Sequence, residues 1–308
     1  MNYELIALIE TDLAHNVARG LQKKLHLADY REFADGEVGV SLEHPEQFAG
    51  KPAVIIQSTG APVNEHTLGV AFLAQELKNA GAVRIIAVIP YCGYARQERS
   101  RIAGKPGSIA VIAKLFEASG IDELVVVDLH EPRAIDFFSI PVHNLKAQSV
   151  IADHIKKEMP SLSKTCLIAP DKGAADYVKQ VAHMIRVGTL IFSKERFAGD
   201  QTRVLGYEGS CSGTTGIILD DIIATGGTAV NVCSALPAMG YKKVYGYFMH
   251  PVLAGPAIER IEKSVFSKIF VSNTLPLLKA AMSPKIAVFD VSAILVTKIN
   301  QLLMDTVS

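Results

Sequence analysis

Short apolar runs alternate with amphipathic segments along most of the chain. The runs predict strands buried on both faces of a parallel sheet, because such strands are hydrophobic throughout. They occupy residues 5–9, 53–57, 84–89, 123–128, 165–168, 189–192, 216–220, 244–248 and 268–271. Helices are predicted at 11–25, 67–80, 107–120, 147–158, 173–183, 229–239, 255–264 and 289–303. This βαβα order predicts an α/β fold with mainly parallel sheets flanked by helices.

The same alternation of strands and helices begins again after Pro141, which predicts two domains, 1–145 and 146–308. A chain of 308 residues is long enough for two cores. The formal net charge is zero, so nucleic acid is not an expected partner. No apolar run is long enough to cross a membrane and no signal peptide is evident, so we expect a cytoplasmic protein. The four cysteines lack metal-ligand spacing, and we expect free thiols.

The richest polar stretch follows the strand at 216–220. Two carboxylates, Asp220 and Asp221, are followed by Ala224, Thr225, Gly226, Gly227 and Thr228, and then by a predicted helix. A glycine-rich turn before a helix offers backbone N–H groups and the positive end of the helix dipole to an anion. The carboxylates can accept hydrogen bonds from vicinal sugar hydroxyls. The alternative is an ordinary solvated turn.

Other polar clusters also follow predicted strands. Arg96 and Gln97 lie in a loop with two tyrosines, which suits phosphates and a purine ring, although a charged surface loop is the alternative. His130 and Asp171 each follow an apolar run and are candidate metal ligands. A single histidine is also common as an ordinary loop residue.

A basic pair lies before a glycine-containing connection. Lys194 and Arg196 face the same way on an extended segment, and residues 199–213, with four glycines, are expected to be mobile. This arrangement is typical of a lid over a phosphate-transfer site, and a solvated hairpin is the alternative. The segment Asp35, Gly36 and Glu37 by itself predicts only a turn.

Together these motifs resemble the ribose-phosphate pyrophosphokinase, or phosphoribosyl diphosphate (PRPP) synthetase, family. The matching stretches run from Phe33 to about Pro276 and include FADGE, VIPYCGYARQER, VVVDLH, APDKGA, SKERF, the 220–228 motif and GPAIERI. The resemblance implies two domains of the type I phosphoribosyltransferase fold, with a last helix at 292–304 that packs back on the first. It implies transfer of the diphosphoryl group of ATP to the C1 hydroxyl of ribose 5-phosphate, giving PRPP and AMP for nucleotide biosynthesis.

The resemblance also implies roles for individual residues. The sugar phosphate would be held by 224–228, and the ribose hydroxyls by Asp220 and Asp221. Magnesium would bind His130 and Asp171, while Lys194 and Arg196 would stabilise the transferred group, with Arg196 also reaching ribose 5-phosphate. ATP would contact Arg96 and Gln97, and also Asp35, Gly36 and Glu37 of a neighbouring subunit. That neighbour implies a homo-oligomer, with dimers assembling into a hexamer.

Some positions depart from the family pattern. Ala224 replaces an acidic or hydroxyl residue, and Glu131, Pro132 and Arg133 replace small residues and a glutamine. Two alternatives therefore stay open: a non-catalytic PRPP synthetase-associated regulatory subunit, and a phosphoribosyltransferase that consumes PRPP. The retained candidate ligands and basic pair favour the synthetase.

Overall fold

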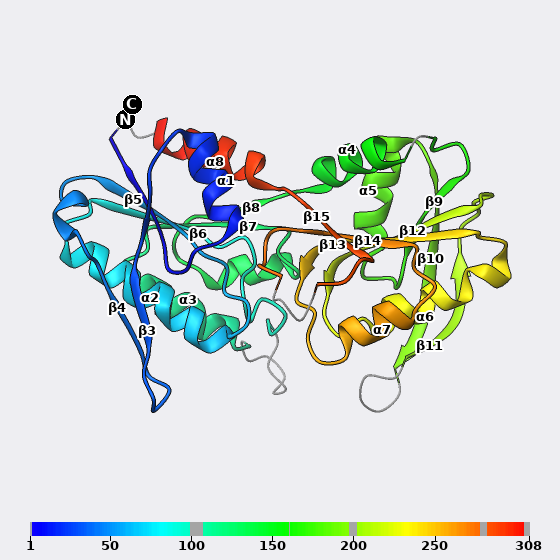
Figure 1. The fold of residues 1–308 in the computed structure, drawn as a ribbon, viewed down its shortest axis with the longest axis horizontal. Coiled ribbons are helices and arrows are strands. Elements are labelled where there is room, and N and C mark those ends of the chain that lie inside the picture. Colours follow the sequence, from blue (N-terminus) through cyan, green and yellow to red (C-terminus); the bar gives the residue numbers. More distant parts are fainter. Residues whose placement is uncertain (1, 99–106, 160, 197–201, 278–281, 305–308) are drawn as a thin grey trace. The chain divides into compact units, whose positions relative to one another are not determined.

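The computed structural model describes residues 2–98, 107–159, 161–196, 202–277 and 282–304 (Figure 1). The side chains of 194–196 and 202–205 are outside that description. The chain divides into two compact units. Unit 1 contains Met1–Leu145, Thr274–Pro276 and Val291–Ser308, and unit 2 contains Lys146–Asn273 and Leu277–Asp290.

Unit 1 is built on a six-stranded sheet in which all pairings are parallel. Its strands, in spatial order, are β2 (Leu25–Leu27), β1 (Glu4–Ala7), β5 (Pro52–Ile56), β6 (Arg84–Val88), β7 (Glu123–Val127) and β8 (Val142–Leu145). The three central strands, β5, β6 and β7, each consist of one half-buried residue followed by four buried ones. Burial on both faces explains why these strands read as continuous apolar runs.

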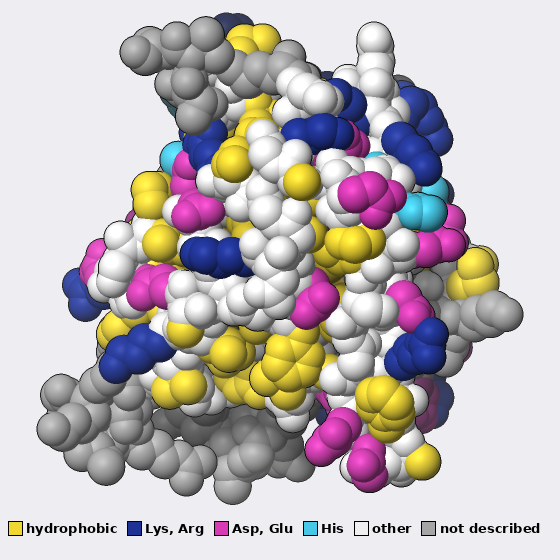
Figure 2. Space-filling view, turned by 90° about the vertical axis from the view of Figure 1, so that its left-hand side faces the viewer, with side chains coloured by type: hydrophobic (Ala, Val, Ile, Leu, Met, Phe, Trp, Pro, Cys, Tyr) yellow, Lys and Arg dark blue, Asp and Glu magenta, His cyan; other side chains and the backbone are white. Residues whose placement is uncertain are grey.

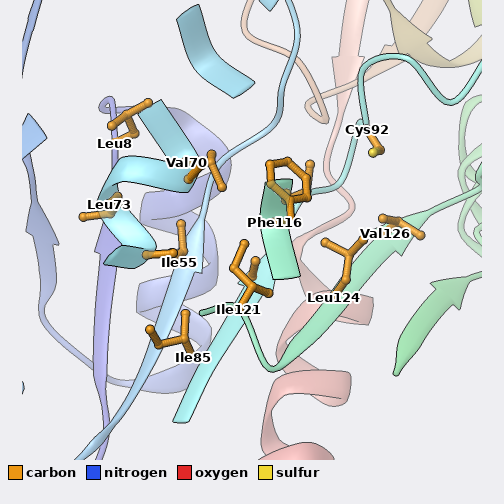
Figure 3. Close-up of a cluster of buried hydrophobic side chains, with 14 of the residues drawn as sticks. Leu8, Ile55, Val70, Leu73, Ile85, Cys92, Phe116, Ile121, Leu124 and Val126 are labelled. Atoms are coloured by element: carbon orange, nitrogen blue, oxygen red, sulfur yellow. The ribbon is translucent and has the colours of Figure 1, made fainter. Parts of the chain in front are cut away.

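Helices cover both faces of this sheet (Figure 1). They are α1 (Asp12–Leu21), α2 (Val63–Asn79), α3 (Ile109–Ala118) and α8 (Ser292–Met304), with short 3₁₀ turns at Pro45–Gln47 and Pro132–Phe137. Apolar side chains from α2, α3 and the sheet form one core, which includes Val70, Ile85 and Phe116 (Figure 3). On the other face α8 packs against α1, where a Cβ at Gly20 would lie 2.7 Å from Val296 Cγ2. The contact therefore depends on a residue without a side chain.

An antiparallel hairpin, β3 (Asp29–Glu32) and β4 (Val38–Ser41), projects from unit 1 (Figure 1). Asp35, Gly36 and Glu37 form its exposed tip. Gly36 has a φ of +89°, which a glycine adopts without strain, and the Glu37 N–H donates to Asp35 Oδ1 at 3.1 Å. The turn expected at this segment is confirmed, while the strands on either side of it were not predicted.

Unit 2 has a seven-stranded sheet. In spatial order its strands are β11 (Thr202–Glu208), β10 (Gly188–Arg196), β9 (Thr165–Ala169), β12 (Thr215–Ile223), β13 (Lys243–Pro251), β14 (Lys268–Ser272) and β15 (Ile286–Phe289). Among the strand pairings of this sheet in the described ranges, only β10–β11 is antiparallel. One face of the sheet carries α4 (Gln148–Glu158) and α5 (Ala175–Ile185), and the other carries α6 (Gly227–Ala235) and α7 (Ala257–Lys263) (Figure 1).

The predicted fold class, an α/β protein with mainly parallel sheets between helices, is confirmed. The helix expected at 11–25 ends at Leu21, before strand β2 begins at Leu25. Apart from this helix end, two expectations about local structure were wrong. Within 199–213, residues 202–208 form strand β11 and are not a polar connection. Phe289 ends strand β15, and the last helix begins only at Ser292. In both places tertiary pairing decides the conformation of a segment whose own pattern is ambiguous.

The cysteines correct a third expectation, because Cys166 and Cys211 form a disulfide. Cys166 lies on β9 opposite Gly188 of β10, and Cys211 follows β11. A Cβ at Gly188 would lie 2.8 Å from Cys211 Sγ, so the glycine leaves room for the bridge. Cys92 and Cys233 are free and buried, and burial raises the pKa of each thiol to about 12.

Candidate active site

The loop after β12 presents backbone N–H groups in one direction. The carbonyl oxygens of Ile223 and Ala224 accept hydrogen bonds from the N–H groups of Leu253 and Ala254, both at 3.0 Å. Across a trans peptide a carbonyl and the following N–H point in opposite directions. The N–H groups of Ala224 and Thr225 are therefore directed away from the 253–254 segment. Successive N–H groups that point the same way form an anion-binding concavity.

Gly226 continues this concavity into α6. It is the N-cap of the helix and has a φ of +74° and a ψ of −6°, a left-handed conformation that favours glycine. Gly227 and Thr228 are the first two residues of α6, where N–H groups lack intrahelical partners and the helix dipole is positive. The structure thus brings all five residues of the predicted phosphate loop, 224–228, into one turn.

Three carboxylates lie close enough to interact at the same edge of the unit 2 sheet. Asp220 is half-buried on β12, and burial raises its pKa well above the usual value, with smaller contributions from the charges of Asp221 and Asp171. The Asp221 N–H donates to Asp220 Oδ1 at 2.9 Å. Asp171 follows β9, the parallel neighbour of β12. Such a group favours a bound cation or a hydroxyl-rich ligand, since either relieves the repulsion among the carboxylates.

Asp171 is held by its own loop. Its Oδ1 accepts from the N–H groups of Gly173 at 2.9 Å and Ala174 at 3.2 Å. This turn fixes the side chain before α5 begins. The carboxylate is therefore preorganised, and its oxygens are of the hard type that magnesium prefers.

The loop after β6 and the start of α2 line a cavity of about 480 Å³ in unit 1. Its lining comprises Val63, Tyr91, Gly93, Tyr94, Arg96 and Gln97. The buried Thr59 side chain accepts from the Gly93 N–H at 2.7 Å, and a Cβ at Gly93 would lie 2.6 Å from the Thr59 carbonyl oxygen. The Ser58 hydroxyl accepts from the Tyr91 N–H at 3.0 Å. The strand end at Ser58 and Thr59 thus positions the loop that carries Arg96 and Gln97.

His130 is exposed just after β7. The chain turns before it at Asp128, a buried residue with a φ of +39°, whose N–H donates to the Leu145 carbonyl at 2.8 Å. The Leu129 N–H donates to Asn144 Oδ1 at 3.0 Å. These bonds to β8 and its end hold the segment that presents His130. Sequence reasoning did not single out Asn144, because only the β7–β8 pairing brings it there.

Lys194 and Arg196 lie on β10, where they pair with Val204 and Thr202 of β11 after an irregularity at Ser193. Two residues apart on a strand, they share a face. Their side chains, and residues 197–201 of the expected lid, fall outside the described part of the chain. Their role stays a prediction.

His130 and Asp171 belong to different units, so their joint binding of one ion also stays a prediction. In the described ranges, no three His, Cys, Asp or Glu side chains cluster in a way that could hold a metal ion on their own. The described helices include none that is long and apolar enough for a membrane span.

Comparison with known proteins gives two matching domain families. Residues 7–120 match the N-terminal domain of ribose phosphate pyrophosphokinase, and residues 195–306 match the phosphoribosyl synthetase-associated domain. The ribose-phosphate pyrophosphokinase 1 of Streptococcus pneumoniae is 34% identical over 92% of this chain and 88% of its own length. The chain belongs to the ribose-phosphate pyrophosphokinase family. The enzyme named ribose-phosphate pyrophosphokinase in Helicobacter hepaticus is 35% identical over 95% of this chain and 93% of its own.

A solved structure agrees with this membership. The phosphoribosylpyrophosphate synthetase from Mycobacterium smegmatis superposes with a TM-score of 0.88 at 29% identity, covering 99% of this chain and 100% of that one. The predicted family and enzyme class are therefore confirmed. The names of these relatives favour a catalytic pyrophosphokinase over the regulatory subunit and the PRPP-consuming transferase.

Proposed function

We propose that this ribose-phosphate pyrophosphokinase transfers the β,γ-diphosphoryl group of ATP to the C1 hydroxyl of ribose 5-phosphate, yielding PRPP and AMP. The observation that carries the substrate assignment is the turn at 224–228. It joins aligned backbone N–H groups to a helix N-terminus directly after two carboxylates. A phosphate at one end and hydroxyls at the other are the recognition elements of a phosphorylated pentose.

In this proposal the loop holds the 5-phosphate, and Asp220 and Asp221 bind the ribose hydroxyls. The raised pKa of Asp220 makes its carboxyl easier to protonate than a solvent-exposed one. A protonated Asp220 can donate a hydrogen bond to a ribose oxygen, and an ionised one accepts from a hydroxyl. The sugar is thereby oriented with its C1 hydroxyl fixed for attack.

ATP occupies the unit 1 cavity in this proposal, where Arg96 and Gln97 contact it. A cavity of about 480 Å³ is in the usual range for a small-molecule site. Lys194 and Arg196 stabilise negative charge on the transferred group, as cations do in phosphoryl transfer. We also propose that Asp35, Gly36 and Glu37 contact ATP bound to a neighbouring subunit.

Magnesium is the proposed cofactor, with His130 and Asp171 as its protein ligands. The preorganised Asp171 carboxylate and the mutual repulsion with Asp220 fit a divalent cation. Magnesium commonly takes one or two carboxylates from a protein and completes its shell with phosphate oxygens and water, so a three-residue protein cluster is unnecessary. When bound, the ion would neutralise charge on the ATP phosphates.

A homo-oligomer is part of the proposal. Unit 1 exposes large apolar side chains on the hairpin and on α2, with 52% of Phe33, 40% of Leu68 and 42% of Phe72 accessible. Figure 2 shows the left-hand side of Figure 1, where hydrophobic side chains lie among charged ones. Such surface is suited to self-association. Size-exclusion chromatography with light scattering tests it, and a monomer at assay concentration would count against the shared ATP site. We also propose a cytoplasmic location for the activity.

The activity test measures AMP release from ATP, magnesium and ribose 5-phosphate in a coupled assay. Folded protein without turnover would reject the catalytic proposal and leave the regulatory subunit. Release of pyrophosphate from PRPP and a nucleobase, in place of AMP from ATP, would identify the transferase. Asp220→Ala should weaken ribose 5-phosphate more than ATP, and equal losses would contradict the sugar assignment.

A further inference from the structure

Arg260, in the GPAIERI stretch, has no part in the function described so far. It lies half-buried on α7, within unit 2. Its guanidinium Nη1 donates a hydrogen bond to the carbonyl oxygen of Thr225 at 3.1 Å. The residue thus reaches back across 35 positions to the middle of the phosphate loop.

With this bond, three consecutive carbonyl groups of the loop are hydrogen-bonded. The carbonyl groups of Ile223, Ala224 and Thr225 all accept hydrogen bonds. The first two accept from backbone N–H groups between β13 and α7, and the third accepts from Arg260 on α7. The Thr225–Gly226 peptide is trans, so its N–H points away from the carbonyl that Arg260 holds. Fixing the Thr225 carbonyl therefore fixes the direction of the Gly226 N–H.

Gly226 is the residue for which such a restraint matters most. Glycine has access to more backbone conformations than any other residue, and this one is held at a φ of +74°. Without the guanidinium, the Thr225 carbonyl would lose this hydrogen bond, and the peptide before Gly226 would be less restrained. The positive charge on the carbonyl side also polarises the peptide and strengthens its N–H as a donor to an anion.

We propose that Arg260 is a positioning residue for the sugar phosphate. It holds the Thr225–Gly226 peptide with its N–H toward the 5-phosphate of ribose 5-phosphate and adds positive charge behind the loop. This rests on the proposed function, because it concerns how the same loop binds its ligand. Arg260 contacts the loop and acts on the ligand through it, so its effect appears in binding of the phosphorylated sugar.

The same helix supplies a matched control. Lys263 also carries a positive charge on α7, but its side chain is 74% exposed and pairs with Glu259 at 2.6 Å. Replacing Lys263 with methionine removes a cation from α7 without touching the loop. A general effect of helix charge or stability would appear in both variants, whereas loop positioning would appear only at Arg260.

The experiment compares wild type, Arg260→Met, Arg260→Lys and Lys263→Met in the AMP-release assay, with thermal unfolding of each. For Arg260→Met we expect a KM for ribose 5-phosphate about tenfold or more above wild type, the loss typical of a charge-assisted hydrogen bond. The KM for ATP should stay within about twofold, since the ATP loop is untouched. Arg260→Lys should recover part of the loss, and Lys263→Met should match wild type.

Several results would overturn the inference. Equal increases in both KM values, or a lowered melting temperature with an unchanged KM for ribose 5-phosphate, would show a merely structural role. If Arg260→Met does not fold, the KM of Arg260→Lys for ribose 5-phosphate is the test. A KM equal to that of wild type would contradict a directional contact. Absence of turnover in wild type rejects the proposed function separately. Calorimetric titration with ribose 5-phosphate then tests the loop directly, and equal affinity of wild type and Arg260→Lys overturns the inference.

Discussion

Removing the Cys166–Cys211 disulfide should destabilise unit 2 substantially. The bridge links positions 45 residues apart and encloses α5, β10 and β11. Opening it returns conformational freedom to this stretch in the unfolded chain. For a ring of that length the chain-entropy relation gives about 4 kcal/mol at 25 °C. That is a large share of the roughly 5–15 kcal/mol that keeps a typical domain folded.

Urea denaturation followed by far-UV circular dichroism measures the effect. With a dependence on urea of up to about 3 kcal/mol/M, a loss of about 4 kcal/mol moves the midpoint down by about 1 M or more. Oxidised and dithiothreitol-treated wild type are compared, and mass spectrometry of unreduced peptides establishes that the bridge is present at the start.

A double variant, Cys166→Ala with Cys211→Ala, is the control. Its midpoint should lie near that of reduced wild type and should not respond to dithiothreitol. Cys92 and Cys233 remain in both proteins, so a response through those thiols would appear in the control as well. Identical midpoints for oxidised and reduced wild type would refute the argument, because they would show that the bridge does not constrain the unfolded state.

Three further predictions concern the site. Lys194→Ala should lower kcat about 100- to 1,000-fold with a much smaller change in the KM for ATP, since a cation of this kind acts in the transition state; unchanged turnover would remove Lys194 from the mechanism. Asp220→Asn should raise the melting temperature at pH 7. The folded-state pKa of Asp220 lies above its unfolded value, so the wild type loses stability as pH rises from the unfolded pKa through the folded one, and the variant does not. The gain should shrink toward pH 4, and a pH-independent gain would contradict this. Gly226→Val should cost about 1–2 kcal/mol of stability, because its φ of +74° disfavours a branched side chain, and should raise the KM for ribose 5-phosphate; a wild-type KM would show that the turn does not bind the phosphate.

Much of the fold follows from local patterns. Continuous apolar runs predict β5, β6 and β7 well, because strands in the middle of a parallel sheet have no solvent face to mark by alternation. Short edge strands such as β2 and β8 were missed because they are only partly buried, so they lack a continuous apolar run. Strand β2 has three residues and none is fully buried, so its only signature is its pairing with β1.

Some features of the site could likewise be predicted from the sequence, and others could not. The turn after Asp220 was predicted because its chemistry lies in consecutive residues. Arg260 and Asn144 act on loops 35 and 15 positions away, so only the folded chain connects them with the loops they hold. The Cys166–Cys211 bridge was missed for the same reason. Residue types indicate possible chemistry, whereas the supporting contacts are consequences of the topology.

The route of the chain has a consequence for how the protein is made. Helix α8 covers α1, yet the ribosome must first synthesise all of 146–291. At common elongation rates this takes on the order of 10–30 s. During that time the amphipathic helix α1 of the nascent first unit lacks its partner α8, and the second unit is still incomplete until its last strand, β15, has been made. We therefore expect chaperones that bind nascent chains to engage α1, and release to coincide with the emergence of the final helix from the exit tunnel.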